Sequence, residues 1–179
     1  MKSQESIPVL GIPINIPSRE EVLRTVGEFF DTTGYHRIAT VNPEFLLLAE
    51  QDAAFREALL AADLRIVDGF GIVLAGLLHG RCIARFPGAD LMDAILRIAN
   101  DRKLSVFLAV RADGLSTYEE VRAAILKKYP DIEILGKDIA QGNIGNWKLE
   151  IGNCAIVLCN FGIPLQETFL SSLKTQTSG

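Results

Sequence analysis

The sequence predicts an α/β fold in which a mostly parallel sheet carries helices on both faces. Short apolar runs alternate with segments whose apolar residues recur at helical spacing. Such alternation at short intervals is typical of parallel strands joined by helical crossovers. Several helical segments also begin with residues that cap a helix N-terminus. We therefore expect a Rossmann-like architecture, built as a single domain over residues 1–179.

The first elements are predicted from capping and turn residues. Residues 7–16 mix apolar residues with glycine and proline, which predicts an edge strand or a hairpin because proline cannot donate within a central ladder. Ser18 and Glu21 have the spacing of a capping box, and the helix that they begin is expected to end at Gly34. Residues 36–41 then predict a strand.

Two nearly all-apolar helices are expected in the next part of the chain. Asn42 is a favourable N-cap, and Pro43 suits the first helical position because its missing N–H would be unpaired there. Asp52 restarts a helix, residues 64–67 predict a short strand, and residues 71–78 are apolar throughout. We expect the helix after Pro43 and the helix over residues 71–78 to be buried.

The remaining chain repeats this alternation. The predicted elements are, in order, a helix over residues 91–99, a strand over 104–110, a helix from Ser116 to Tyr129, a strand over 132–135, a weak helix around Trp147, a strand over 155–159 and a helix from Pro164 to Lys174. Ser116 and Glu119 have capping-box spacing, and Pro130 stops that helix. The strand over 155–159 is apolar throughout, as expected of a strand covered on both faces.

The composition is that of an ordinary globular protein and excludes several functional classes. Of 179 residues 49% are hydrophobic, and the net charge of −4 gives no reason to expect a nucleic-acid partner. The three cysteines form no C-x-x-C pair and no cluster with histidine, so we expect reduced, buried thiols in a cytoplasmic protein and no zinc site. No signal-peptide pattern is present, and the longest apolar run falls short of the ~20 residues that span a bilayer.

Polar residues follow two of the predicted strands where each strand ends. Thr40 and Asn42 close the first strand, and Asp68 follows the second. Ligands of open α/β sheets bind at the carboxyl ends of strands, next to helix N-termini, so we interpret these segments as two walls of one pocket. Asp68 is a candidate general base, while Thr40 and Asn42 can hold a sugar or a phosphate. The alternative is that Asp68 caps the next helix and that Thr40 and Asn42 are ordinary strand-end and cap residues.

Two further residues are candidates for substrate binding. Arg85 can pair with phosphate oxygens through its planar guanidinium group, although a solvated loop charge is the alternative. Gln166 follows the last predicted strand and a Gly-x-Pro turn, which places it at the same sheet edge, although it can equally be an exposed residue of a first helical turn.

The glycines after Asp68 leave a different interpretation open. Gly69 and Gly71, with Asp90 about twenty residues beyond, imitate a dinucleotide-binding fingerprint, but the third glycine is Gly76 and does not have the required spacing. No Asp-x-Asp sequence occurs, so a metal-bound diphosphate has no obvious ligands and we expect no metal site.

Five short motifs stand out along the chain. They are TVNPE at residues 40–44, DGFGIV at 68–73, RFPGADL at 85–91, YP at 129–130 and GIPLQE at 162–167. Each alone is weakly informative, but in this order and at this spacing they resemble the WecG/TagA/CpsF glycosyltransferases over residues 7–170.

The resemblance implies an inverting transfer of an N-acetylmannosamine-type sugar from a UDP-sugar to a polyprenyl-diphosphate-linked N-acetylglucosamine. Such products feed wall teichoic acid, enterobacterial common antigen or capsule, and the acceptor lies at the inner face of the cytoplasmic membrane. Asp68 matches the family's proposed base, and Thr40 and Asn42 match its substrate-pocket residues. Arg85 and Gln166 match positions that contact the donor or the leaving diphosphate. The resemblance implies no metal and no cofactor.

The resemblance has two departures. Leu165 stands where the family usually has lysine, and the family's Arg-Ala-Pro motif and basic membrane-docking segment do not follow. We therefore expect membrane contact of the full-length family but not of this chain, and impaired transfer. We also expect a homo-oligomer, or else partial disorder of residues 160–179. An active transferase, a non-catalytic UDP-sugar-binding remnant and a dinucleotide-binding module remain alternatives.

Overall fold

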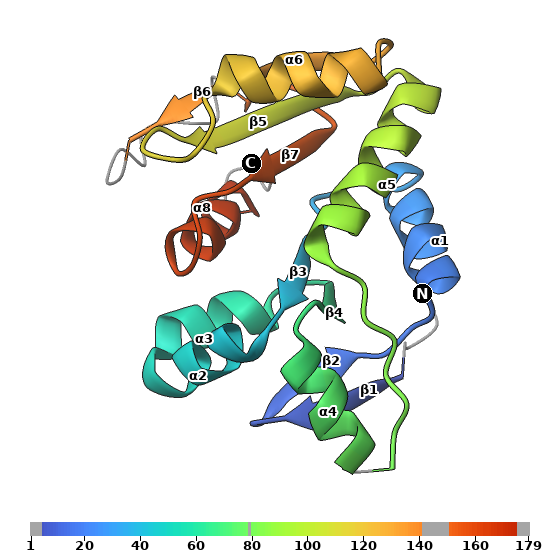
Figure 1. The fold of residues 1–179 in the computed structure, drawn as a ribbon, viewed down its shortest axis with the longest axis vertical. Helices are drawn as coiled ribbons and strands as arrows, with labels where there is room; N and C mark the ends of the chain where they lie inside the picture. The colour runs from blue at the N-terminus through green and yellow to red at the C-terminus, as the bar shows by residue number, and fades with distance from the viewer. Residues whose placement is uncertain (1–4, 79, 141–150, 175–179) are drawn as a thin grey trace. The chain divides into compact units, whose positions relative to one another are not determined.

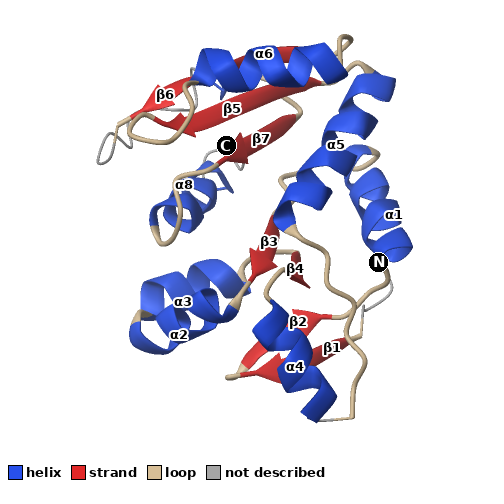
Figure 2. Ribbon diagram, in the orientation of Figure 1, coloured by secondary structure: helices blue, strands red, loops and turns tan. Residues whose placement is uncertain are grey.

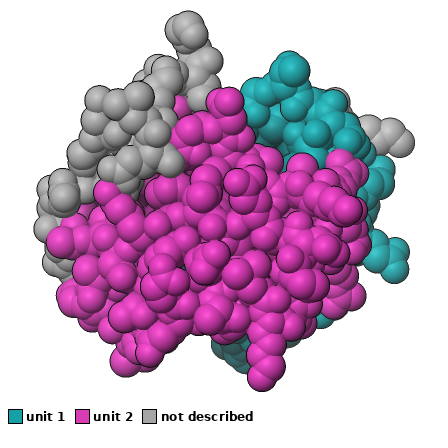
Figure 3. All heavy atoms as spheres, turned by 90° about the horizontal axis from the view of Figure 1, so that it is seen from above, with its two compact units in different colours: residues 1–92 teal, residues 93–179 magenta. Residues whose placement is uncertain are grey.

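The computed structural model describes residues 5–78, 80–140 and 151–174 (Figure 1). The described residues form helices together with parallel strand pairs, which confirms the α/β fold class. The chain divides into two compact units, residues 1–92 and residues 93–179, which are teal and magenta in Figure 3. Each unit has strands of its own.

Unit 1 begins with the predicted hairpin. β1 (Ser6–Val9) and β2 (Ile12–Asn15) pair antiparallel. Leu10 and Gly11 join them with φ values of 47° and 72°, and positive φ at both central residues is the requirement of the type I′ turn that suits a twisted hairpin. Ile12 and Ile14 are fully buried, so one face of β2 belongs to the core of unit 1.

Arg65 ties this hairpin to the parallel strands of unit 1. It lies in β4 (Leu64–Val67), which pairs in parallel with β3 (Ile38–Val41). The main-chain N–H of Arg65 donates to Asn15 Oδ1 at 2.8 Å, and its Nε donates to the Pro13 carbonyl at 2.7 Å. The main chain and the side chain of one strand residue thus each donate a hydrogen bond to the hairpin, and the bounds predicted for β4 are confirmed.

The first helix begins as predicted but ends earlier. In α1 (Arg19–Phe30), the Ser18 hydroxyl accepts from the Glu21 N–H and the Glu21 carboxylate accepts from the Ser18 N–H, which is a complete capping box. The helix ends with Asp31 as its C-cap, whose N–H bonds to carbonyls of the last turn. The prediction that Gly34 ends the helix is therefore wrong, because the last carbonyls are already satisfied before it.

The next two helices start at the predicted caps. Asn42 caps α2 (Pro43–Gln51) and Asp52 caps α3 (Ala53–Leu60) through their side-chain oxygens. Each cap accepts from the N–H of a phenylalanine three residues on, and these two buried rings meet edge to face with centroids 5.7 Å apart. The capping residues thus fix both helix starts while the same turns supply apolar packing.

The two helices expected to be buried each expose an apolar face. In α2, Leu47 is 52% exposed. In α4 (Phe70–Leu78), the buried residues are Ile72 and Gly76, whereas four other large apolar residues are exposed. A helix that is apolar all round gives no periodic signal of which face meets the core, so the sequence could not indicate this exposure.

Unit 2 is built on a three-stranded parallel sheet. β5 (Ser105–Arg111) lies between β6 (Glu133–Ile139) and β7 (Ile156–Cys159), and residues 106–110 of β5 are all buried. α6 (Tyr118–Lys128) lies along β5 and β6 (Figure 2). The sheet confirms the predicted parallel arrangement, and β6 extends four residues beyond the strand predicted over 132–135.

α5 (Gly88–Arg102) runs from unit 1 into unit 2, where it is bonded to the end of α6. Asp93 accepts from the Lys128 ammonium and, at 2.8 Å, from the Tyr129 hydroxyl. Both hydrogen bonds hold the pKa of the Asp93 carboxyl below its usual value, and the bond from Lys128 has the larger effect. The charged pair is largely exposed to solvent, so it contributes more to helix placement than to stability.

The ends of the helices in unit 2 differ slightly from expectation. α6 is capped by Thr117 with Glu120, one residue after the predicted pair, and the N–H of Tyr118 donates to Asp138 Oδ1 of β6 at 2.8 Å. This contact between distant residues favours the capping box of Thr117 and Glu120 over the adjacent pair, Ser116 and Glu119. The last helix, α8 (Leu165–Lys174), follows Pro164 as predicted. The weak helix around Trp147 and the last five residues lie outside the described residues.

The three cysteines are free, but they are not all buried as expected. Cys82 is exposed, while Cys154 and Cys159 are partly covered. Burial, and then the nearby Glu167 carboxylate, raises the pKa of the Cys159 thiol. A raised pKa lowers the fraction of thiolate, which is the nucleophilic form of a cysteine.

Gly136 is expected to be the most sensitive position of the unit 2 sheet. A Cβ at this residue of β6 would lie 2.1 Å from the main-chain oxygen of Leu108 and 2.8 Å from Tyr118 Cε2. The oxygen belongs to the central strand and cannot move without breaking the ladder. We expect Gly136→Ala to lower the free energy of unfolding by about 3 kcal/mol. Urea unfolding measures this, with Gly27→Ala as control because a Cβ there meets nothing within 4 Å. Equal stability of the two variants would contradict the prediction.

Candidate active site

Parallel pairing of β3 and β4 brings two predicted site segments to one edge of the sheet. Val41 lies opposite Val67 at the last register position, so the residues that follow both strands emerge together. The Val41 carbonyl accepts from the N–H of Asp68 at 2.9 Å and from the N–H of Gly69 at 3.3 Å. Thr40, the penultimate residue of β3, therefore lies on the strand adjacent to the one that delivers Asp68.

Gly69 and Gly71 allow the two strand ends to approach closely. A Cβ on Gly69 would lie 2.4 Å from Pro43 Cδ and 3.0 Å from Asn42 Cα, and a Cβ on Gly71 would lie 2.9 Å from Pro43 Cγ. Both glycines are thus used for packing against the start of α2. In a dinucleotide fold the corresponding glycines admit a pyrophosphate, so this packing removes the support for that alternative.

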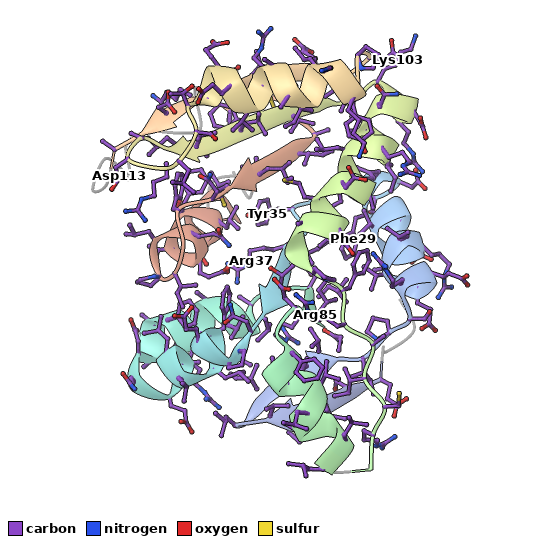
Figure 4. All side chains as sticks on the ribbon, viewed as in Figure 1. Phe29, Tyr35, Arg37, Arg85, Lys103 and Asp113 are labelled. Carbon is purple, nitrogen blue, oxygen red and sulfur yellow. The ribbon has the colours of Figure 1, made fainter. Side chains whose placement is uncertain are left out.

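Arg85 is held directly against Asp68. Its Nε donates to the main-chain carbonyl of Asp68, and its Nη2 lies 3.3 Å from Asp68 Oδ1. The Arg85 side chain is labelled in Figure 4. The side chains of Arg85 and Asp68 remain 49% and 29% exposed, so the ion pair is accessible to a ligand. The alternative of a merely solvated loop charge does not hold for Arg85.

The residue after Arg85 explains how a loop arginine reaches this position. The N–H of Phe86 donates to the Val67 carbonyl at 2.8 Å, which extends the hydrogen bonding of β4 to the loop. The Phe86 ring is buried, and the Arg19 guanidinium lies 4.6 Å from its centroid. The motif therefore contains an anchor, Phe86, next to the functional candidate, Arg85, and the sequence alone did not indicate that Phe86 has this role.

The N-terminus of α5 closes another side of this site. A Cβ on Gly88 would lie 3.2 Å from Thr40 Oγ1 and 3.5 Å from Asp68 Oδ2, so the hydroxyl and the carboxylate both lie against the first residue of the helix. Unpaired N–H groups give a helix N-terminus a partial positive charge that favours anions. In the sequence, the signal for Gly88 was only a Pro-Gly pair before a helix, which did not indicate this role.

Asn42 combines two functions at the start of α2. Its Oδ1 accepts from the Phe45 N–H at 3.1 Å, which confirms the predicted cap. Capping uses only the oxygen of the amide, so the Nδ2 group can still donate to a ligand. The cap and the substrate-binding role are therefore compatible at this residue.

The fifth candidate lies in the other unit. Gln166 is the second residue of α8, and its N–H donates to the Gly162 carbonyl at 3.0 Å. The structure thus gathers Thr40, Asn42, Asp68 and Arg85 within unit 1, and the membership of Gln166 in the same site stays a prediction. Leu165, which stands where the family usually has lysine, is the first residue of α8.

The chemistry available to the four gathered side chains is proton acceptance, anion binding and hydrogen bonding to a sugar. Among the described residues there is no group of three or more His, Cys, Asp or Glu side chains arranged to hold a metal ion. Over the same residues, no helix has the length and apolar character needed to cross a bilayer.

A carboxylate, an arginine and a hydroxyl at adjacent strand ends agree with the motifs found in the sequence. The profile of the glycosyl transferase WecG/TagA/CpsF family matches residues 7–179. The chain belongs to the WecG/TagA/CpsF family. The match includes every candidate residue in both units, so the motifs quoted from the sequence are those of a family member.

Three relatives of this chain share the name N-acetylglucosaminyldiphosphoundecaprenol N-acetyl-β-D-mannosaminyltransferase. The Bacillus subtilis strain 168 protein is 28% identical over 142 residues, which are 76% of this chain and 54% of that protein. The Staphylococcus aureus proteins of strains MRSA252 and NCTC 8325 are 25% and 29% identical over 177 residues, 95% of this chain and 68% of theirs. The chain therefore spans about half of the first relative and about two thirds of the others.

The ion pair predicts a specific requirement for arginine at position 85. Lysine keeps the charge but cannot reach both the carbonyl and the carboxylate of Asp68 as the guanidinium does. We expect Arg85→Lys to lower kcat/KM for sugar transfer by about tenfold or more. Arg97→Lys is the matched control, because the exposed Arg97 pairs with Asp93, four residues before it, in unit 2. Equal activity of the two variants in steady-state kinetics would contradict this role.

Proposed function

We propose that the chain transfers an N-acetylmannosamine-type sugar from a UDP-sugar to a polyprenyl-diphosphate-linked N-acetylglucosamine, with inversion at the anomeric carbon. Membership of the family and the names of the relatives support the sugar and the acceptor. The observation that carries the proposal is the position of Asp68, at a strand end, paired with Arg85 and lying against the N-terminus of α5 with Thr40.

In the proposed reaction Asp68 is the general base. Its carboxylate accepts the proton of the acceptor hydroxyl while the hydroxyl oxygen attacks the anomeric carbon of the donor. A new glycosidic bond forms as the bond between that carbon and the UDP oxygen breaks, and the diphosphate keeps the electron pair. Attack from the face opposite the leaving group inverts the configuration. Arg85 fixes Asp68 through its main-chain carbonyl and its carboxylate, which orients the base for this step.

The same arrangement accounts for the leaving group and for sugar binding. The negative charge that develops on UDP is stabilised by Arg85 and by the helix N-termini at the strand ends. Thr40 and Asn42 donate and accept hydrogen bonds at the sugar or phosphate. No step of the proposal uses a metal. We place the reaction in the cytoplasm, at the inner face of the membrane that holds the acceptor.

A transfer assay tests this proposal. The purified chain is incubated with UDP-N-acetylmannosamine and an N-acetylglucosamine-diphosphate acceptor on a short alkyl chain, and the disaccharide product is identified by mass and by the anomeric coupling in NMR. Thermal unfolding with UDP and with NAD is measured beside it, because a ligand that binds the folded state raises Tm. Stabilisation by UDP without transfer would favour the non-catalytic remnant. Stabilisation by NAD alone would overturn the proposal.

A further inference from the structure

α4 presents a continuous exposed apolar face next to the site. The face consists of Phe70, Leu74, Leu77 and Leu78, whose relative exposures are 70%, 50%, 55% and 81%. At about 100° per residue these positions fall on one side of a helix, and the buried Ile72 falls on the opposite side. Four large apolar side chains gathered on one exposed face are typical of a binding surface rather than of scattered surface residues.

The helix is locked in this rotation. A Cβ on Gly76, on the buried side, would lie 2.2 Å from Ile83 Cδ1 and 3.3 Å from the main-chain oxygen of Arg81, so this side of the helix packs closely on the segment that follows it. At the start of the helix Gly71 packs on Pro43. Contacts at both ends therefore keep the α4 face turned outward, and the exposure is a fixed property of the fold of unit 1.

The α4 face starts beside the candidate base and leads away from it. Phe70 follows Asp68 by two residues, and at a rise of about 1.5 Å per residue Leu74 and Leu78 lie about 6 and 12 Å further along the helix axis. A ligand held with a reacting hydroxyl at Asp68 can therefore extend its remaining length over the leucines.

The segment that contains α4 has no acidic residue. From Gly69 to Ala89 the sequence contains no aspartate or glutamate, although the whole chain has a net charge of −4. The same stretch contains two arginines, Arg85 at Asp68 and Arg81, which is exposed and pairs with Glu5 at 2.8 Å. The apolar face thus lies in a segment without negative charge of its own, which suits an apolar chain that carries phosphate.

We propose that the α4 face binds the first isoprene units of the acceptor's polyprenyl chain. The inference rests on the proposed function, whose acceptor has a hydroxyl, then a sugar, then a diphosphate and then the isoprenoid chain. The protein offers complementary groups for the two ends of this acceptor: the Asp68 carboxylate for the hydroxyl, and the leucines of α4, the helix that begins two residues later, for the isoprenoid chain. A bilayer surface or a second copy of the chain could also cover the α4 face. Neither would account for the position of this face directly after Asp68.

Binding of two small probes tests the inference without any transfer. Farnesyl diphosphate and inorganic diphosphate share the anion and differ in the isoprenoid chain. Calorimetric titration is made on the unaltered chain, on Leu74→Gln/Leu78→Gln, on Leu78→Gln alone, and on the control Leu115→Gln/Leu135→Gln, whose leucines are exposed in unit 2. We expect the unaltered chain and the control to bind farnesyl diphosphate more tightly than diphosphate. The double α4 variant is expected to lose about tenfold of that preference, and the single variant is expected to lose part of it.

Three results would overturn the inference. An unchanged preference in both α4 variants would mean that the face does not contact the chain. Binding to vesicles without prenyl lipid that the double variant loses would assign the face to a bilayer. A dimer in light scattering that the double variant converts to monomer would assign it to a second copy.

The proposed function is judged separately. The Tm increase caused by UDP is expected to be the same in the α4 variants as in the unaltered chain. The function itself is judged on the unaltered chain, by this Tm increase and by transfer to the short-alkyl acceptor. Absence of both in the unaltered chain would refute the function, whereas the diphosphate titrations alone decide the role of α4.

Discussion

Asp68→Asn is expected to lower kcat of sugar transfer by about 10²–10⁴-fold while leaving the affinity for UDP nearly unchanged. An amide has almost the shape of a carboxylate but cannot accept the proton of the attacking hydroxyl. The Arg85 Nε bond goes to the main-chain carbonyl of residue 68 and survives the substitution, so the strand end keeps its position. Steady-state kinetics give kcat, and calorimetric titration with UDP gives the affinity.

The control for this variant is Asp113→Asn. Asp113 also accepts from an arginine, with Arg111 Nε at 2.6 Å from its Oδ1, but it lies in unit 2 on an exposed turn (Figure 4). The loss of an exposed ion pair there should leave kcat within about twofold, because such pairs contribute little. Near-normal turnover of Asp68→Asn would reduce Asp68 to a structural residue at the strand end, and the proposed base would be wrong.

The parts of the fold that the sequence predicted correctly depend on local chemistry. The caps Asn42 and Asp52 act on N–H groups three residues away, and the bounds of β4 follow from an apolar run closed by Asp-Gly. The errors arise where local signals are ambiguous. Adjacent residues could cap α6, and the choice depends on a hydrogen bond from Tyr118 to Asp138 of β6.

In the site, too, some features follow from the local sequence and others depend on contacts between distant residues. That Thr40 and Asp68 would lie near each other follows from the rule that parallel strands end at one edge. The pairing of Arg85 with Asp68 could not be predicted, because seventeen residues separate them and the loop is placed by the bond between Phe86 and the Val67 carbonyl. The exposure of α4 was also unpredictable, because its sequence is apolar on every side.

Gly69→Ala is expected to damage both stability and activity, since this residue sets the distance between the two strand ends. The added Cβ would lie 2.4 Å from Pro43 Cδ and 3.0 Å from the main-chain Cα of Asn42, so the start of α2 or the Asp68 segment must move. Overpacking of this kind costs about 1–3 kcal/mol of folding free energy. A displacement of about 1 Å between Asp68 and the residues of β3 is expected to lower kcat about 10²-fold, because the reacting groups lose their alignment.

Measurements on the folded fraction separate the two effects of Gly69→Ala. Urea unfolding gives the loss of stability, and kinetics at a temperature well below Tm give kcat for protein that is fully folded. Gly27→Ala, in α1, is again the control, because its Cβ meets no atom within 4 Å and alanine is favourable inside a helix. A Gly69→Ala chain with the stability and kcat of Gly27→Ala would show that the strand ends can separate without consequence. In that case the close approach of Gly69 to Asn42 and Pro43 would not be what positions the candidate base.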